Sequence, residues 1–166
     1  MKNTYLLLAI VLLLAVAVVA AVDFSGTWVM NADKTTAANP APPAGGGGGG
    51  GGGGRGGGGM GGGDMTIKQA GNVMTISRMM GQNSVDTAYT MDGADHTSSG
   101  QQGDTKYKAV LVGNSVHITG TMTTQRGDQA VDTTYALSDD GKTLTVTTVR
   151  QGQNGPTSRK QIYDKK

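Results

Sequence analysis

Apolar and polar residues alternate along most of the chain, and this period of two constrains the fold more than any other feature. After residue 23, no stretch carries apolar residues at the three- and four-residue spacing of an amphipathic helix. Alternating runs predict about nine strands, at residues 24–30, 65–67, 73–79, 85–91, 105–111, 116–122, 131–137, 144–148 and 159–164. We therefore expect an all-β protein.

Turn residues between these runs indicate how the strands connect. Gly113-Asn114 is a two-residue hairpin signal, because both residues tolerate positive φ, and Asp140-Gly141 marks another tight turn. Asp92-Gly93 predicts a looser loop that continues through Gly103. Such short connections leave no room for crossover helices, so we expect an antiparallel, up-and-down meander. Because successive strands are sequence neighbours throughout, the meander should close as a small β-barrel of about eight to ten strands.

The N-terminal residues 1–22 predict a signal peptide. Lys2 precedes an apolar run of 18 residues, and the small residues Val19-Ala20-Ala21 suit cleavage just before Asp23. An uncleaved membrane anchor is the alternative, because this run is at the lower edge of spanning length. With cleavage, the protein would be secreted or periplasmic, without stable membrane insertion. The absence of cysteine excludes disulfides and fits a bacterial periplasm or exterior.

A glycine-rich tract separates the first predicted strand from the rest of the domain, which we place at residues 23–166. Of the 29 glycines, 17 lie between Gly45 and Gly63. Such a composition cannot bury apolar area, so a disordered loop is expected at 40–64, acting as a spacer or flexible lid. Gly54-Arg55-Gly56 resembles a fragment of an RNA-binding segment, but a single arginine supplies almost no phosphate affinity. No nucleic-acid partner is expected, and the net charge of +2 agrees.

Composition also argues against catalysis, metal binding and a cofactor. The chain contains neither cysteine nor glutamate, which removes thiolate ligands and one of the usual acid–base residues. His117 is out of phase with its apolar neighbours and should face solvent, whereas His96 falls in the predicted polar loop. No Ser-His-Asp set and no paired carboxylates can be identified. We therefore predict a protein that is not an enzyme.

Motifs at both ends of the mature chain resemble the lipocalin and fatty-acid-binding (calycin) superfamily. Gly26-Thr27-Trp28 stands directly after the predicted signal, and Arg159-Lys160-Gln161-Ile162-Tyr163 forms the last strand. The layout is most similar to small secreted bacterial lipocalin-like domain proteins. This resemblance implies a β-barrel with a ligand cavity. It also implies that Gly26 and Trp28 form the closed end and that Arg159 packs over the indole of Trp28.

In fatty-acid-binding proteins an Arg-x-Tyr pair on the last strand grips the ligand carboxylate. Tyr163 matches the tyrosine of this pair, but Gln161 occupies the position of the arginine, and Arg159 lies one alternation earlier. The helical lid of those proteins is also absent from the sequence, where the glycine tract stands instead.

Five residues are candidate ligand contacts, because the alternation or the resemblance places them on the inner face: Tyr89, Tyr107, Tyr135, Arg150 and Tyr163. Two interpretations remain open. The protein is a secreted, non-catalytic, lipocalin-like monomer that binds or carries a small hydrophobic or amphipathic molecule. Alternatively, the tyrosines fill the barrel and Arg150 lies at a wet rim, in a structural or protein-interaction barrel of the cell envelope or exterior that holds no ligand.

Overall fold

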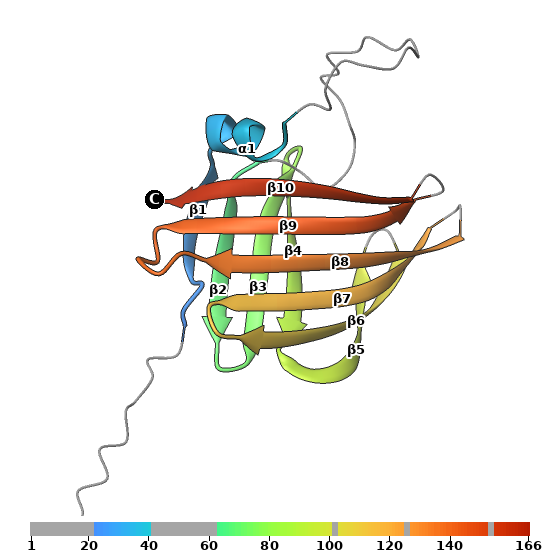
Figure 1. Ribbon diagram of the computed structural model, residues 1–166. Coiled ribbons are helices and arrows are strands. Elements are labelled where there is room, and N and C mark those ends of the chain that lie inside the picture. Colours follow the sequence, from blue (N-terminus) through green and yellow to red (C-terminus); the bar gives the residue numbers. More distant parts are fainter. Residues whose placement is uncertain (1–21, 41–62, 101–102, 125–126, 153–154) are drawn as a thin grey trace, which may run out of the picture.

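The computed structural model describes residues 22–40, 63–100, 103–124, 127–152 and 155–166 (Figure 1). The predicted signal peptide, apart from its last residue, and nearly all of the predicted disordered loop lie outside these described residues. Both stay predictions, as do the domain limits that depend on them.

Ten antiparallel strands form one sheet within the described residues, in the order β4-β3-β2-β1-β10-β9-β8-β7-β6-β5. The strands are β1 (Gly26–Met30), β2 (Met65–Ala70), β3 (Val73–Met80), β4 (Asn83–Thr90), β5 (Asp92–Gly100), β6 (Gly103–Val112), β7 (Ser115–Thr124), β8 (Gly127–Leu137), β9 (Thr143–Gly152) and β10 (Gly155–Lys165). One helix, α1 (Ala32–Ala38), follows β1. The predicted all-β meander is therefore confirmed.

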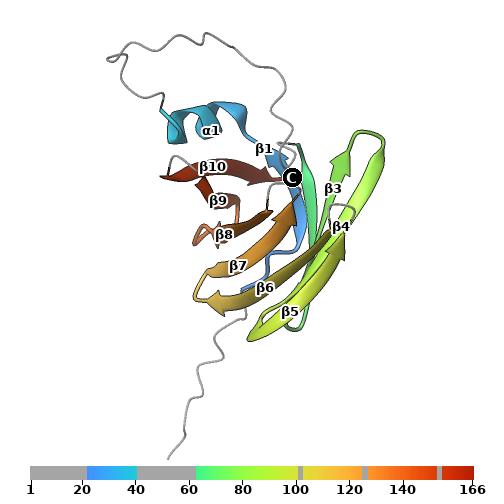
Figure 2. The same ribbon diagram turned by 90° about the vertical axis from the view of Figure 1, so that its right-hand side faces the viewer.

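The sheet curls into a nearly closed barrel, in which β1 pairs with β2 on one side and with β10 on the other (Figure 2). Trp28 of β1 lies opposite Met65 of β2 and opposite Lys165 of β10, which joins the two ends of the chain. The sheet's outer strands, β4 and β5, meet at Met91, whose N–H donates to the carbonyl of Asn72 (2.7 Å). No ladder joins β4 to β5 in the part of the chain that the structure describes. The barrel therefore has a seam between these two strands.

The prediction of a loose loop from Asp92 to Gly103 is wrong, because residues 92–100 form β5. This strand pairs only with β6, and its register shifts between Asp92 and Asp95, where Gly93 has φ +74°. A strand at the edge of a sheet needs no continuous apolar pattern, since one side pairs and much of the rest stays in water. The polar composition of β5 concealed it for that reason.

The helix α1 was also absent from the sequence-based prediction. Its seven residues bury no side chain, so it has no apolar stripe. It is capped by Asn31, the residue before it, whose side chain accepts the N–H of Lys34 (2.9 Å). Side chains attach α1 to the part of β10 that precedes the residues paired with β1. The Asn39 amide bonds both backbone groups of Lys160 (2.7 and 2.9 Å), and Thr35 Oγ1 accepts the N–H of Ile162 (2.9 Å).

The core lies on the inner face of the barrel and takes residues from β1–β3 and β6–β10. Alternate residues of the strands point into it, and the largest fully buried side chains are Trp28, Tyr163, Phe24, Met65, Ile67, Met74, Leu144 and Val116. Burying each such side chain stabilises the fold by about 1.5–3 kcal/mol. The core positions the inner face of the sheet, on which the polar groups described next are found.

Candidate functional site

Trp28, which the resemblance places at the closed end of the barrel, is 0% exposed. Its indole N–H donates to the carbonyl of Phe24 (3.0 Å), and Gly26, with φ +150°, lies two residues before it. The cation over the indole is Lys165, whose Nζ is 5.3 Å from the ring centroid. The predicted packing of Arg159 over Trp28 is therefore wrong. Arg159 lies opposite Thr148 on β9, six residues before the β10 residue that pairs with Trp28.

Two of the candidate tyrosines pack near the β4–β5 seam. The rings of Tyr89 and Tyr107 meet edge to face, with centroids 5.1 Å apart, and His96 of β5 stacks on Tyr107 at 5.5 Å. The hydroxyl of Tyr107 accepts the backbone N–H of Thr90 (3.1 Å). That hydroxyl thus satisfies a backbone donor of β4 next to the seam, and Tyr107 has a structural role.

A guanidinium that sequence reasoning missed lies inside the barrel. Arg78 of β3 lies opposite the buried Met65, so it shares the inner face. Its Nη2 reaches across the barrel to the hydroxyl of Tyr135 (3.3 Å) and also contacts the sulfur of Met65 (3.6 Å). Its Nε is buried and has no partner in the described structure. The signal was present in the sequence, because Arg78 continues the alternation of Met74 and Ile76.

Two further polar side chains are buried on the same inner face. Gln161 is 6% exposed and Tyr163 is fully buried, yet the amide nitrogen of Gln161 and the hydroxyl of Tyr163 meet no partner among the described residues. Gln161 and Tyr135 both lie opposite Val146 of β9, one on each side, so the three share the inner face. We refer to Arg78, Tyr135, Gln161 and Tyr163 as the inner polar cluster.

Electrostatics keep the cluster rich in hydrogen-bond donors. Burial raises the pKa of Tyr135 and of Tyr163 above the ordinary value, although the positive charge of Arg78 acts on both in the opposite direction. Both phenols are therefore neutral at physiological pH, and a guanidinium is always charged. A neutral phenol, an amide and a guanidinium can all donate to a single oxyanion.

The remaining candidate, Arg150, lies on β9 opposite Thr157 of β10 and Val131 of β8. It is half-buried and stands farther along the sheet than the inner polar cluster. The structure thus brings together Tyr135 and Tyr163 of the five candidates and adds Arg78 and Gln161 to them. Tyr89 lies close enough for Tyr135 and Arg78 to act on its pKa, which burial raises, and Tyr107 packs against Tyr89. Arg150 lies apart from this group.

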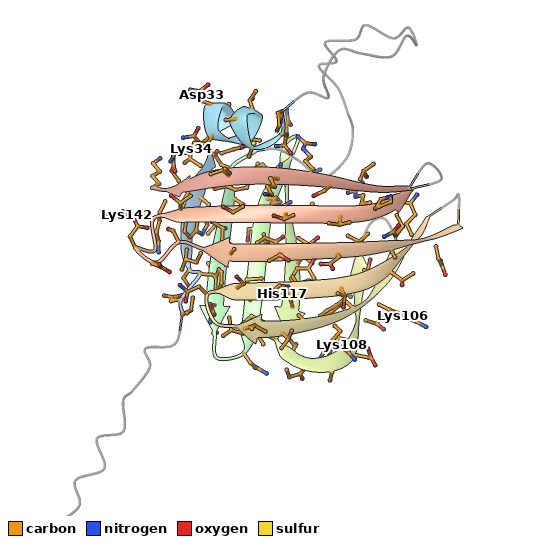
Figure 3. All side chains as sticks on the ribbon, viewed as in Figure 1. Asp33, Lys34, Lys106, Lys108, His117 and Lys142 are labelled. Atoms are coloured by element: carbon orange, nitrogen blue, oxygen red, sulfur yellow. The ribbon has the colours of Figure 1, made fainter. Side chains whose placement is uncertain are left out.

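The histidines lie away from this cluster. His117 is exposed on the outer face of β7 (Figure 3), with Nδ1 3.3 Å from the hydroxyl of Thr134. His96 bonds the carboxylate of Asp92 (2.8 Å). In the described parts of the chain, no three side chains of histidine, cysteine, aspartate or glutamate gather as a metal site requires. Among the same residues, no helix has the length and apolar character needed to cross a bilayer.

A hollow of about 370 Å³ lies beside β6 and β7, where it is lined by Asp95, Thr119 and the exposed Lys106 and Lys108. Figure 3 shows both lysines projecting away from the barrel. This hollow is open and polar and differs in chemistry from the apolar interior around the inner polar cluster.

Comparison with known proteins identifies the fold. A scan of family models found no match, and a search of curated proteins found none either. Among solved structures, the chain is similar to the REP1-NXSQ fatty acid transporter, at 14% identity over 86% of this chain and 95% of that chain, with a TM-score of 0.51. It is also similar to apo Caenorhabditis elegans lipid binding protein 8, at 10% identity over 62% and 70% of the two chains, with a TM-score of 0.50. At these identities the likeness establishes the fold alone, which is a calycin-type β-barrel.

Proposed function

We propose that the protein binds and carries a small amphipathic molecule whose acidic head group is held by the inner polar cluster. The observation that carries this proposal is the set of three buried polar atoms, Arg78 Nε, Gln161 Nε2 and Tyr163 Oη, that have no hydrogen-bond partner among the described residues. Buried polar groups in folded proteins are almost always hydrogen-bonded, so each exception calls for an explanation.

A bound oxyanion would supply that explanation. Each buried donor left unpaired costs about 1–3 kcal/mol, and a bound acceptor removes this penalty. A carboxylate has two oxygens and about four lone-pair positions, so it can accept from a guanidinium, an amide and a phenol at once. Hydrogen bonds of this kind, with an ionised partner, are about twice as strong as neutral ones.

The rest of the interior suits an apolar tail. Met65, Met74 and Ile76 lie on the inner face near Arg78, and methionine adapts readily to ligands of varying shape. The two similar solved structures are described as a fatty acid transporter and a lipid binding protein, which is the class of cargo proposed here. Gln161, which stands where fatty-acid-binding proteins have arginine, is part of the cluster, and Arg78 supplies the charge from the opposite wall.

The carrier works outside the cytoplasm, as a secreted or periplasmic protein, because the predicted signal peptide at residues 1–22 would export it. We further propose that it is a monomer. The carrier is not an enzyme, since the donors of the cluster can bind and orient an acid but include no nucleophile paired with a base.

The test begins with the full chain purified under native conditions and examined for bound lipid by mass spectrometry. Calorimetric titration with dodecanoate and with dodecanol then measures how much the carboxylate contributes to the binding free energy. We expect dodecanoate to bind about tenfold more tightly, corresponding to about 1.4 kcal/mol. Arg78→Met should abolish this preference, whereas Lys68→Met, which removes an exposed charge from β2, should preserve it.

Two results would count against the proposal. Equal binding of the acid and the alcohol by the unmodified protein would show that the cluster does not select a head group. Absence of any copurifying lipid, together with Trp28 emission that ignores both ligands, would favour the alternative of a filled, structural barrel.

A further inference from the structure

Two more arginines occupy the inner face of the sheet, beyond the inner polar cluster. Arg159 lies opposite Thr148, and Arg150 lies opposite Thr157, so the two are diagonal neighbours on β10 and β9. Both keep the alternation of the buried residues Val146 and Gln161. Diagonal pairs on one face are within reach of long side chains, so the two guanidiniums can act on one group.

The barrel is open where these arginines stand. The three residues of β1 that pair with β10 lie opposite residues 163–165, so the part of β10 that contains Arg159 has no β1 partner. In Figure 1, the ends of β8, β9 and β10 that lie away from the C-terminus extend beyond β1–β4. Arg150 is accordingly half-buried and Arg159 exposed. We refer to Arg150 and Arg159 as the rim arginines.

No acidic side chain balances the inner arginines. Among the described strand residues, no aspartate occupies an inner position of the register; Asp86, Asp132 and Asp164, for example, alternate with inner residues and lie outward. Asp64 raises the pKa of Tyr163 as the weakest of several causes, and this carboxylate is exposed and accepts the N–H of Met30 (3.2 Å).

Two lysines outside the barrel have acidic partners, Lys34 with Asp164 (2.7 Å) and Lys108 with Asp95 (3.6 Å). None of the three inner arginines has an ion pair in the described structure. The inner face of the sheet, from the cluster to the open rim, therefore presents three permanent positive charges, and a ligand with a single carboxylate would balance only one of them.

The spacing of these groups sets the geometry of a matching ligand. Arg159 precedes Gln161 by two residues and Tyr163 by four, which corresponds to roughly 7 and 13 Å along an extended strand. Arginine binds carboxylate and phosphate through a planar fork of donors, so two adjacent guanidiniums suit a second oxyanion at that distance.

We infer that the ligand has an acidic group at each end: one bound by the inner polar cluster and the other by the rim arginines. The ligand class is a dianionic amphiphile such as a medium-chain α,ω-dicarboxylate, with its apolar middle along the barrel wall. This inference rests on the proposed function and sharpens it, because an ordinary fatty acid would leave the rim arginines facing a methyl group.

The test compares dodecanedioate with dodecanoate by calorimetric titration of the full chain. We expect the unmodified protein to prefer dodecanedioate by about tenfold. In the double variant Arg150→Gln/Arg159→Gln this ratio should fall to about one. The matched control, Lys106→Gln/Lys108→Gln, removes two cations from the outer face of β6 and should keep the ratio, which separates direct contact from a general effect of net charge.

Each result is decisive. A ratio near one in the unmodified protein, or a preference retained in the rim variant, overturns the second acidic site while leaving the binding of dodecanoate intact. Loss of the preference in both double variants also overturns it, because net charge would then explain the effect. If neither acid binds the unmodified protein, the proposed function fails and this inference fails with it.

Discussion

A double-mutant cycle on Arg78 and Tyr135 tests whether the inner polar cluster serves ligand binding or stability. Arg78 donates to Tyr135 across the barrel, but its Nε has no partner. Tyr135→Phe removes the acceptor of a charged donor and should destabilise the protein by about 2 kcal/mol. Arg78→Met leaves the phenol without its donor but also removes the unpaired Nε, and these two effects of about 1–3 kcal/mol offset each other.

The double variant Arg78→Met/Tyr135→Phe removes both partners and the unpaired nitrogen together. Replacing both members of a buried polar pair by apolar groups of similar shape is close to neutral or stabilising, so its free energy of unfolding should equal or exceed that of the unmodified protein by up to about 1 kcal/mol. The coupling energy between the two sites is then about 2 kcal/mol. Dodecanoate should no longer be preferred over dodecanol.

Urea unfolding followed by circular dichroism measures each corner of the cycle, and equal slopes with denaturant establish that the same surface unfolds. Arg159→Met, the same replacement at an exposed position, should change stability by less than about 0.5 kcal/mol. A double variant that is less stable than the unmodified protein by more than about 2 kcal/mol would refute the reasoning, because the pair would then hold the barrel together.

Three other predictions concern the frame of the barrel. Trp28→Ala should destabilise by about 3–5 kcal/mol in urea, and a loss below about 1 kcal/mol would contradict its burial. The pKa values of Tyr135 and Tyr163 are raised from 10.0 by burial, so their contribution is fully present below that pH and is lost as pH rises through the folded values. Unfolding midpoints should fall above pH 10, and Tyr163→Phe should flatten that fall. Gly120→Ala would place a Cβ 2.6 Å from a backbone oxygen of β6 and should destabilise by about 1–3 kcal/mol, unlike Gly63→Ala, whose Cβ meets nothing within 4 Å; equal thermal midpoints for the two variants would contradict this.

Much of the barrel could be predicted from local sequence patterns, because the pattern within each inner strand indicates which of its faces is buried. In the strand that contains Val146, for example, apolar residues alternate with polar ones, and this pattern alone predicts which face of the strand is buried. The edge strand β5 and the helix α1 lack this information. Neither buries a continuous apolar face, and both depend on partners distant in sequence.

The candidate site was only half predictable for the same reason. Tyr135 and Tyr163 were found from alternation and motif, but their partner Arg78 interrupts an apolar run and comes from the opposite wall. Similarly, the cation over Trp28 depends on the register of β1 against β10, which places Lys165 there and leaves Arg159 far along the strand. The register between strands that are distant in sequence depends on the closed barrel, so it cannot be predicted from a short stretch of sequence.

The docking of α1 has a consequence for how far the sheet can grow. Where β1 ends, the free edge of β10 is met by the amide of Asn39 and the hydroxyl of Thr35, which bond the backbone of Lys160 and Ile162 as another strand would. A strand added at this edge would present a fresh edge of its own to the next molecule. Two side chains on a helix present none. The sheet therefore cannot be extended at this edge, because the backbone groups of Lys160 and Ile162 are already bonded within the chain. A strand of a second copy of the protein cannot pair with them.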